Sequence, residues 1–350
     1  MKLIHCADLH IGSKMDSKYP AQKAKTRRQE LRNAFVDLVE EAGKIGAEAI
    51  LISGDAFDSD HPGEKDLEYF YKVIAAHPSI EFFYLRGNHD IDGFGPEEPL
   101  PNLHTFSQTK WKTYLLPDKR VTISGFEITE DNQDALYSFE GLKANPGCYN
   151  IGMLHGQIGY DINLKKLAHH GFHYLALGHI HSYQMHELDD KAVAVYPGTL
   201  EPRGFDETGE KGFVIIDTDK RQRFFQPFNK RTIHWEELDI SGLNSGFDIS
   251  NAVKAKLTTP TDIYRIELTG EKPAEVLLDL DDIASYCQGC CFLLDLIDKT
   301  KIPMAVEEEK IDTPLIKEFV AKIKENDKLT EAEKAEAIQI GIKALAGKEF

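Results

Sequence analysis

Five short segments of the chain are rich in side chains that bind metal ions. Each carries carboxylate, amide or imidazole groups and follows a run of apolar residues. The segments are Asp8-Leu9-His10, Gly54-Asp55-Ala56-Phe57-Asp58, Gly87-Asn88-His89-Asp90, His155-Gly156 and Gly178-His179-Ile180-His181. Because strand ends direct side chains from separate strands into one crevice, two carboxylates, one amide and four imidazoles are expected to converge. Such a set suits two divalent cations about 3.5 to 4 Å apart, with a carboxylate bridging them.

The spacing inside these segments favours the same interpretation. Residues two apart on an extended segment face the same way, so Asp8 and His10 are expected to face one side, as are His179 and His181. The residues between them, Leu9 and Ile180, are then free to pack into the fold. A fixed tetrapeptide such as that at positions 87–90 arises by chance about 0.002 times in a chain of this length. The five segments in this order, which we call the ordered series, therefore indicate a metal centre, whereas any one histidine alone would not.

Strands must hold these segments in place, and the apolar runs before them have the length of buried strands. The runs cover residues 1–4, 49–52, 82–85, 151–154 and 174–177. Between the first two, residues 28–44 show helical spacing of apolar side chains. The alternation predicts a layered α/β domain with its chemistry on loops at strand ends.

The pattern changes near Arg231. We expect strands over 234–240, 263–268 and 292–297, and helices over 248–257 and 274–286. Pro314 suits the first position of a further helix, and the residues from Thr330 to Glu333 match a capping box for a last helix. The sequence thus predicts three parts: a layered domain over 1–230, a small α+β domain over 231–310, and a helical hairpin over 311–350.

The charge of the chain argues at first against a polyanionic substrate. The formal net charge is −17, and phosphate backbones are normally held by Lys and Arg. Directly after His10, however, residues 14–32 carry seven basic and only two acidic side chains. Charges beyond about 8 Å are screened at physiological salt, so this local excess outweighs the distant total. The residues interpreted as contacts to DNA phosphates are Lys14, Lys18, Lys23, Lys25, Arg27 and Arg28.

An ordinary solvated helix face remains the alternative for this basic segment. A second basic cluster has the same two interpretations; it comprises Lys220, Arg221, Arg223, Lys230 and Arg231. The five cysteines are odd in number and form no disulfide framework, which favours a reducing cytoplasm. No run of about 18 apolar residues occurs, so no membrane span is expected.

The ordered series resembles the motifs of the calcineurin-like metallophosphoesterase superfamily. Within it, further stretches resemble the SbcD-type DNA repair nucleases over about residues 1–220: His10-Ile11-Gly12, residues 85–90, and residues 196–202 running to 210–213. The resemblance implies a four-layer α/β/β/α sandwich over 1–230 that carries the nuclease site. It also implies that the part over 231–310 is a capping domain that binds DNA.

The resemblance also implies residue roles, in two ligand groups with one bridge. One metal is held by Asp8, His10 and His181, the other by Asn88, His155 and His179, with Asp55 between them. A hydroxide between the metals attacks phosphorus. His89 stabilises charge on the phosphate or protonates the leaving 3′ oxygen as a general acid. Asp58 or Asp90 orients His89, or both are ordinary loop carboxylates.

The expected activity is therefore that of a Mn²⁺-dependent DNA nuclease and exonuclease that processes DNA ends. The ligands alone would also accept Zn²⁺ or Fe. The resemblance implies a homodimer that works with an SbcC-type ATPase, and the C-terminal hairpin either binds that ATPase or packs on its own domain. Two alternatives stay open: a phosphatase or cyclic-nucleotide phosphodiesterase of the same superfamily, and a DNA-end-binding scaffold without turnover.

Overall fold

The computed structural model describes residues 1–15, 19–58, 63–90, 96, 98–116, 120–272, 278–301, 314–326, 328–330, 333–334, 337–338 and 340–341. Contacts divide the chain into two compact units, Met1–Ile233 and His234–Phe350. The division lies close to the predicted limit at 230. The predicted limit at 310 falls outside the described residues.

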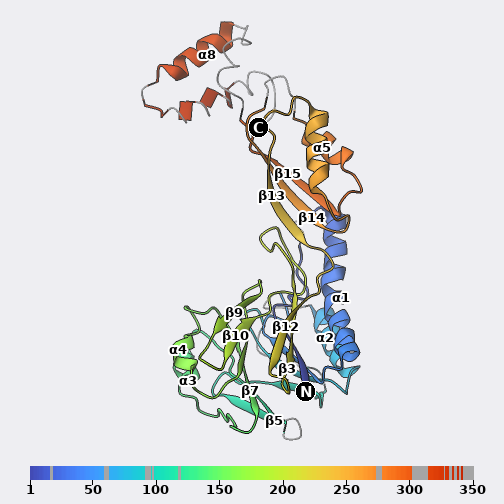
Figure 1. Cartoon of the computed structure of the whole chain (residues 1–350), viewed down its shortest axis with the longest axis vertical. Helices are drawn as coiled ribbons and strands as arrows, with labels where there is room; N and C mark the ends of the chain where they lie inside the picture. Colours follow the sequence, from blue (N-terminus) through green and yellow to red (C-terminus); the bar gives the residue numbers. More distant parts are fainter. Residues whose placement is uncertain are drawn as a thin grey trace. The chain divides into compact units, whose positions relative to one another are not determined.

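Two six-stranded sheets form the first unit (Figure 1). In the first sheet the order is β12 (Gln222–Pro227), β11 (Gly212–Asp217), β1 (Lys2–Cys6), β2 (Ala49–Ser53), β3 (Glu81–Leu85) and β4 (Leu103–Thr105). In the second it is β5 (Lys112–Leu116), β6 (Val121–Gly125), β7 (Tyr149–His155), β8 (Tyr174–Gly178), β10 (Val193–Tyr196) and β9 (Gln184–Glu187). The strands β1 to β4 are parallel, as are β6, β7, β8 and β10.

The apolar runs of the central strands are explained by burial on both faces, as expected for parallel strands covered on each side. In β2, Ile50 and Ile52 pack in the core under the helices α1 (Ala21–Ile45) and α2 (Glu64–Ala75). Ala49 and Leu51 pack instead in the core between the two sheets. A third core lies under the short helices α3 (Gln133–Leu136) and α4 (Leu164–Leu167).

These three cores separate four layers, with α1 and α2 on one side of the unit and α3 and α4 on the other (Figure 1). The predicted α/β/β/α fold class is therefore confirmed.

Helix α1 begins at Ala21, earlier than the predicted start at residue 28. Pro20, with its fixed φ of −53°, precedes the first turn. The buried face of the first turns carries Ala24, Arg27 and Glu30 in place of large aliphatic side chains. The apolar periodicity therefore starts about two turns later than the helix itself.

The second unit contains a three-stranded sheet in the order β13 (Ile233–Asp239), β14 (Ile263–Thr269) and β15 (Leu293–Asp298). Helices α5 (Gly246–Lys256) and α6 (Leu280–Tyr286) share its core. Helix α6 is shorter than the predicted 274–286, because Asp279 caps it by accepting hydrogen bonds from the amides of Asp281 and Asp282 at 3.0 and 3.1 Å. Residues 274–277 of that prediction lie outside the described residues.

The C-terminal part contains α8 (Pro314–Lys324), which begins at the predicted proline. The predicted capping box forms: the amide of Thr330 donates to Glu333 at 2.7 Å, and the amide of Glu333 donates to Oγ1 of Thr330 at 3.3 Å. A Cβ atom at Gly341 would lie 2.1 Å from the ring of Phe319, so the chain after the box returns onto α8. Among the described helices, none is long and apolar enough to cross a membrane.

Candidate metal centre

Neighbouring parallel strands bring the predicted ligands to one edge of the two sheets. Asp8 follows β1, Asp55 follows β2, and Asn88 follows β3 in the first sheet. His155 ends β7 and His179 follows β8 in the second sheet. The carboxyl ends of parallel strands meet at one edge, and the sheets pack face to face, so side chains from both sheets share one space.

Four residues of the site have backbones in the left-handed region, which L-residues rarely adopt. The φ angles are 52° at Asp8, 46° at His10, 50° at Asp55 and 103° at His179. The amide of Asp8 donates to Gly54 O at 3.0 Å, and the amide of His10 donates to Asp55 O at 3.0 Å. Each such conformation costs about 1–3 kcal/mol, and these bonds between adjacent loops help hold it in place.

Three glycines leave the room that the ligands occupy. A Cβ atom on Gly54 would lie 2.1 Å from Nδ1 of His155, and one on Gly87 would lie 2.2 Å from Oδ1 of Asp55. On Gly178 it would lie 1.8 Å from the carbonyl oxygen of Ser53. Any side chain at these positions would displace a candidate ligand or the strand beside it.

Asp8, His10 and His181 form the first cluster, which we call the His10 group. One donor atom from each lies within 4.8 Å of the others. The Nε2 atoms of His10 and His181 face each other at 3.2 Å, and at most one of two facing ring nitrogens can donate a proton to the other. Both carboxylate oxygens of Asp8 accept from the amide of His179, at 3.0 and 3.1 Å. Burial raises the pKa of Asp8 to about 7, against the opposing effect of His155.

Two carboxylates and one guanidinium hold the far sides of these imidazoles. Nδ1 of His10 lies 3.2 Å from Asp58, and Nδ1 of His181 lies 2.9 Å from Glu207. Arg203 binds both carboxylates. Burial alone would raise the pKa of Glu207, but its hydrogen bond with His181 and the charge of Arg203 lower it to about 2. Partners of this kind fix the orientation of metal-binding histidines.

Asn88, His155 and His179 form the second cluster, which we call the His155 group. Oδ1 of Asn88 lies 3.0 Å from Nε2 of His155 and 3.2 Å from Nδ1 of His179. Nδ1 of His155 lies 2.9 Å from the carbonyl oxygen of Ser53, which accepts its proton and leaves Nε2 facing the cluster. Burial alone would lower the pKa of His155, but its contact with Asp55 raises it to about 9.

Asp55 lies beside the His155 group, with Oδ2 3.4 Å from Nε2 of His155. Its other oxygen accepts from the amide of His89 at 2.9 Å. Asp8, Asp55 and His155 form a further set of donor atoms within 4.8 Å of one another. The site thus offers carboxylate, amide and imidazole donors with facing lone pairs, a set that fits divalent transition-metal ions. The bridging role of Asp55 stays a prediction.

His89 lies next to His10 at the edge of the candidate ligand set. Its ring packs edge-on against His10 with the centroids 5.5 Å apart, and its side chain is partly exposed. Asp90 accepts from the amides of Ala56, Phe57 and Gly87 at 3.0–3.1 Å. Asp58 is bound by Arg203 and lies beside His10. Among the described residues, neither Asp58 nor Asp90 hydrogen-bonds with the His89 ring. The predicted orienting role of Asp58 and Asp90 has no support in these contacts.

The predicted phosphate contact by Arg27 is wrong. Arg27 is fully buried, and its guanidinium donates to Glu30 at 2.6 Å, to Glu201 at 2.9 Å and to Pro202 O at 2.8 Å. Arg231, from the second basic cluster, also binds Glu30. A guanidinium enclosed by two carboxylates inside the fold cannot reach a phosphate in solvent.

Other basic side chains of the first cluster do reach the surface. Lys14 and Lys25 are exposed, Lys23 and Arg28 are partly exposed, and Lys18 lies outside the described residues. A cavity of about 380 Å³ beside the His10 loop is lined by Gly12, Ser13, Lys25, Arg28, Gln29, Arg32 and Asp66. DNA binding by these residues stays a prediction.

Sequence reasoning missed Arg203 and Glu207. Both lie in a loop after β10, four residues apart, where the motif pattern gave no reason to select them. A buried carboxylate with a lowered pKa is the signal that marks Glu207, and this signal exists only in the folded chain.

Comparisons with known proteins agree with this geometry. A family model described as calcineurin-like phosphoesterase matches residues 1–183. The chain is 28% identical over 261 residues to the uncharacterized metallophosphoesterase YhaO of Bacillus subtilis, covering 69% of this chain and 63% of YhaO. It is 25% identical over 320 residues to the DNA double-strand break repair protein Mre11 of Saccharolobus solfataricus, covering 82% of this chain and 81% of that protein.

Coverage of other relatives is lower. The chain spans 54% of the length of Mre11 from Methanopyrus kandleri, at 23% identity. Among solved structures, TT1561 of Thermus thermophilus is similar over 65% of this chain and 98% of that chain, with 14% identity and a TM-score of 0.41.

Proposed function

Because this chain belongs to the calcineurin-like phosphoesterase family, we propose that it is a metal-dependent DNA nuclease that hydrolyses phosphodiesters near DNA ends. The observation that carries the proposal is the convergence of seven donor side chains from two sheets, with the His10 and His155 groups side by side. The Mre11 relatives, named as double-strand break repair proteins, support DNA as the substrate.

In this proposal the His10 group holds one cation, the His155 group holds the other, and Asp55 bridges them. When bound, the two cations would lower the pKa of water towards about 7 and offset the charge of the phosphate. Mn²⁺ is the ion we expect. The carboxylates beside His10 and His181, the half-buried Asp58 and the buried Glu207, keep both rings turned to the site.

His89 is the proposed general acid. Its backbone amide donates to Asp55, and its ring rests against His10, so the imidazole is held next to the proposed ligands. Within the described part of the chain, no carboxylate hydrogen-bonds with the ring. A partly exposed ring that has no hydrogen-bond partner among the described residues can approach a substrate oxygen. It would protonate the leaving 3′ oxygen or stabilise charge on the phosphate.

The proposal also covers the oligomeric state, the protein partner and the cell compartment. We expect a homodimer that works with an SbcC-type ATPase in the cytoplasm. A chain with a formal net charge of −17 would bind DNA weakly alone, and an ATPase that clamps DNA would compensate for this. Residues 311–350 are the proposed contact for that partner.

The test compares linear double-stranded DNA, single-stranded DNA and a small chromogenic phosphodiester in Mn²⁺. We expect the DNA substrates to be cut, and His89→Ala to lower kcat about 10²- to 10⁴-fold with unchanged Mn²⁺ binding. The exposed His169 gives the matched control, and His169→Ala should turn over normally.

Each contrary outcome points to a different rival. Turnover of the small ester alone would replace the nuclease with a phosphatase or cyclic-nucleotide phosphodiesterase. Tight DNA binding without turnover of any substrate would favour the end-binding scaffold. Loss of Mn²⁺ binding in His89→Ala would make His89 a ligand.

A further inference from the structure

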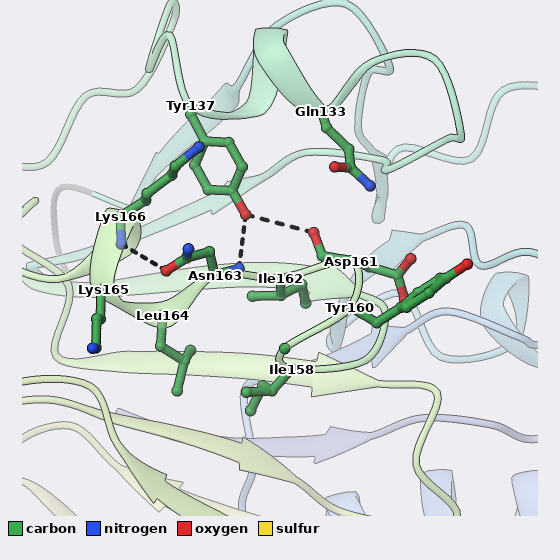
Figure 2. Close-up of a pocket in the computed structure, with 11 residues that line it drawn as sticks. Gln133, Tyr137, Ile158, Tyr160, Asp161, Ile162, Asn163, Leu164, Lys165 and Lys166 are labelled. Carbon is green, nitrogen blue, oxygen red and sulfur yellow. Dashed lines mark hydrogen bonds between the residues drawn. The ribbon is translucent and has the colours of Figure 1, made fainter.

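A second cavity, of about 500 Å³, lies beside the loop that follows β7 (Figure 2). Its lining combines aromatic and cationic side chains. Those that the argument uses are Tyr137, Tyr160, Asp161, Lys165 and Lys166. We call it the Tyr160 pocket.

The loop that carries Tyr160 is held firmly by its own hydrogen bonds. The amides of Asp161 and Ile162 donate to Gln157 O at 2.9 and 3.0 Å, and Gly159 donates to Ile162 O at 2.8 Å. The amide of Gln157 donates in turn to the Asp161 carboxylate at 2.7 Å. The loop is therefore fixed before any ligand arrives.

Tyr196 fastens the same loop to the second sheet. Its hydroxyl donates to Gly156 O at 2.8 Å and accepts from the amide of Ile158 at 2.9 Å. Ile162 is buried in the core under α3 and α4. Tyr160 is nevertheless 83% exposed, so a rigid loop holds its ring in solvent.

A single exposed aromatic residue is common on protein surfaces. Tyr160 differs because cations flank the same cavity, and Figure 2 shows it across the lined space from the two lysines. The ammonium of Lys166 lies 4.5 Å from the centre of the Tyr137 ring. Lys165 is exposed and has no partner among the described residues. Aromatic faces with nearby cations are the chemistry that binds single-stranded nucleic acid.

The pocket adjoins the proposed metal centre. Gly156 directly follows His155, and its amide donates to Gly178 O at 3.2 Å, next to His179. A Cβ atom on Gly156 would lie 2.8 Å from Cβ of Asp161, so the loop packs against the backbone that presents the His155 group. A strand with one phosphate at the metals would pass its next nucleotide near this loop.

We propose that the Tyr160 pocket holds the nucleotide beside the scissile phosphodiester of a single strand. The base stacks on Tyr160, and Lys165 contacts its phosphate. A base inside a duplex is covered on both faces by its neighbours, whereas an unstacked base exposes a face to a protein ring, so the pocket favours a single-stranded or unpaired end. The inference rests on the proposed nuclease function and names a part of its substrate site.

The experiment uses two single strands of equal length. One carries bases, and the other consists of abasic tetrahydrofuran units with the same phosphates. For the strand with bases, Tyr160→Ala should raise KM about 5- to 100-fold, whereas Tyr160→Phe should stay near wild type. For the abasic strand, Tyr160→Ala should have no effect, because no ring is left to stack.

Two further variants complete the test. Phe224 is a matched exposed aromatic on β12, 54% exposed, and Phe224→Ala should change neither substrate. Lys165→Gln should raise KM for both strands equally, since both strands keep their phosphates. An equal effect of Tyr160→Ala on both strands, or none on either, would overturn the base-stacking proposal. Normal kinetics for Lys165→Gln would overturn the phosphate contact.

Failure of the nuclease proposal would look different. In that case the wild-type protein cuts neither strand, and binding is measured instead with 2-aminopurine in the strand. Quenching by the wild-type protein that Tyr160→Ala lacks would still support the pocket. Equal fluorescence with both proteins would overturn it.

Discussion

The His10 group and the His155 group contain similar candidate ligands but are supported in different ways. In the His10 group, charged carboxylates stand behind His10 and His181, and Arg203 joins those carboxylates. In the His155 group, a neutral backbone carbonyl stands behind His155, and Asn88 is exposed. The charged side chains behind the His10 group, which we call the ionic scaffold, are Asp58, Glu207 and Arg203. The His155 group is positioned instead by the backbone of its strands.

The ionic scaffold extends well beyond the site. Arg27 on α1 donates to Pro202 O, directly before Arg203, and binds Glu201. The position of Arg203, and through it of Glu207 and His181, thus depends on a buried pair on another layer of the fold. In the proposed two-metal site, we expect the His10 group to bind its cation more tightly than the His155 group does, and substitutions in the scaffold to weaken this binding selectively.

The largest expected effect comes from Arg27. Arg27→Met keeps much of the packing but leaves Glu201 buried without its guanidinium, and removing one partner of a buried pair costs about 3–5 kcal/mol. We expect the free energy of unfolding to fall by that amount in urea denaturation. Lys25→Met on the same helix, with an exposed side chain, is the matched control and should unfold as wild type does.

Burial raises the pKa of Glu201, so its charge depends on Arg27. Replacing both partners removes the uncompensated charge, and Arg27→Met/Glu201→Gln should recover part of the lost stability. A double variant as unstable as the sum of the two single variants would show that packing, rather than charge, holds this region.

The second effect separates the two ligand groups. Glu207→Gln removes the charge behind His181 and should weaken one of two Mn²⁺ binding steps about 10- to 100-fold, measured by isothermal titration calorimetry. The other step should be unchanged, since no described contact joins Glu207 to the His155 group. Glu210→Gln, at an exposed carboxylate nearby, is the control. Equal weakening of both steps would contradict the comparison.

The smallest effect concerns the surface near the His10 loop. Lys14→Ser/Lys25→Ser should weaken DNA binding a fewfold and lower its dependence on salt, because each lost phosphate contact reduces the salt slope by about one. Fluorescence anisotropy at several salt concentrations measures this. An unchanged slope would remove these lysines from the interface.

The sequence predicted the fold class and the convergence of ligands because both follow from local patterns. Apolar runs of strand length ended in polar residues, and parallel strands bring such ends together. Asp8, Asp55 and His155 come from three strands of two sheets, and this rule predicted that they converge, whereas their grouping as ligands was implied by the family resemblance.

The supporting residues could not be predicted in the same way. Arg27 has the sequence context of a surface cation, and only the folded chain shows two carboxylates around it. Glu207 reaches His181 across 26 positions of chain. Side-chain partners at such separations depend on loop conformation, which no periodicity encodes, and the start of α1 was misplaced because buried charged residues hid its apolar face.

The three glycines without room for a Cβ atom have a consequence for genetics. In a saturation screen for lost activity, Gly54, Gly87 and Gly178 should score as intolerant as the ligands, with even alanine rejected. A map of substitution tolerance would therefore include these glycines in the site, although they donate no side-chain atom to it. Metal titration of purified variants would separate the glycine positions from the candidate ligand positions. An alanine variant at one of these glycines keeps every donor atom and changes only how the donor atoms are arranged.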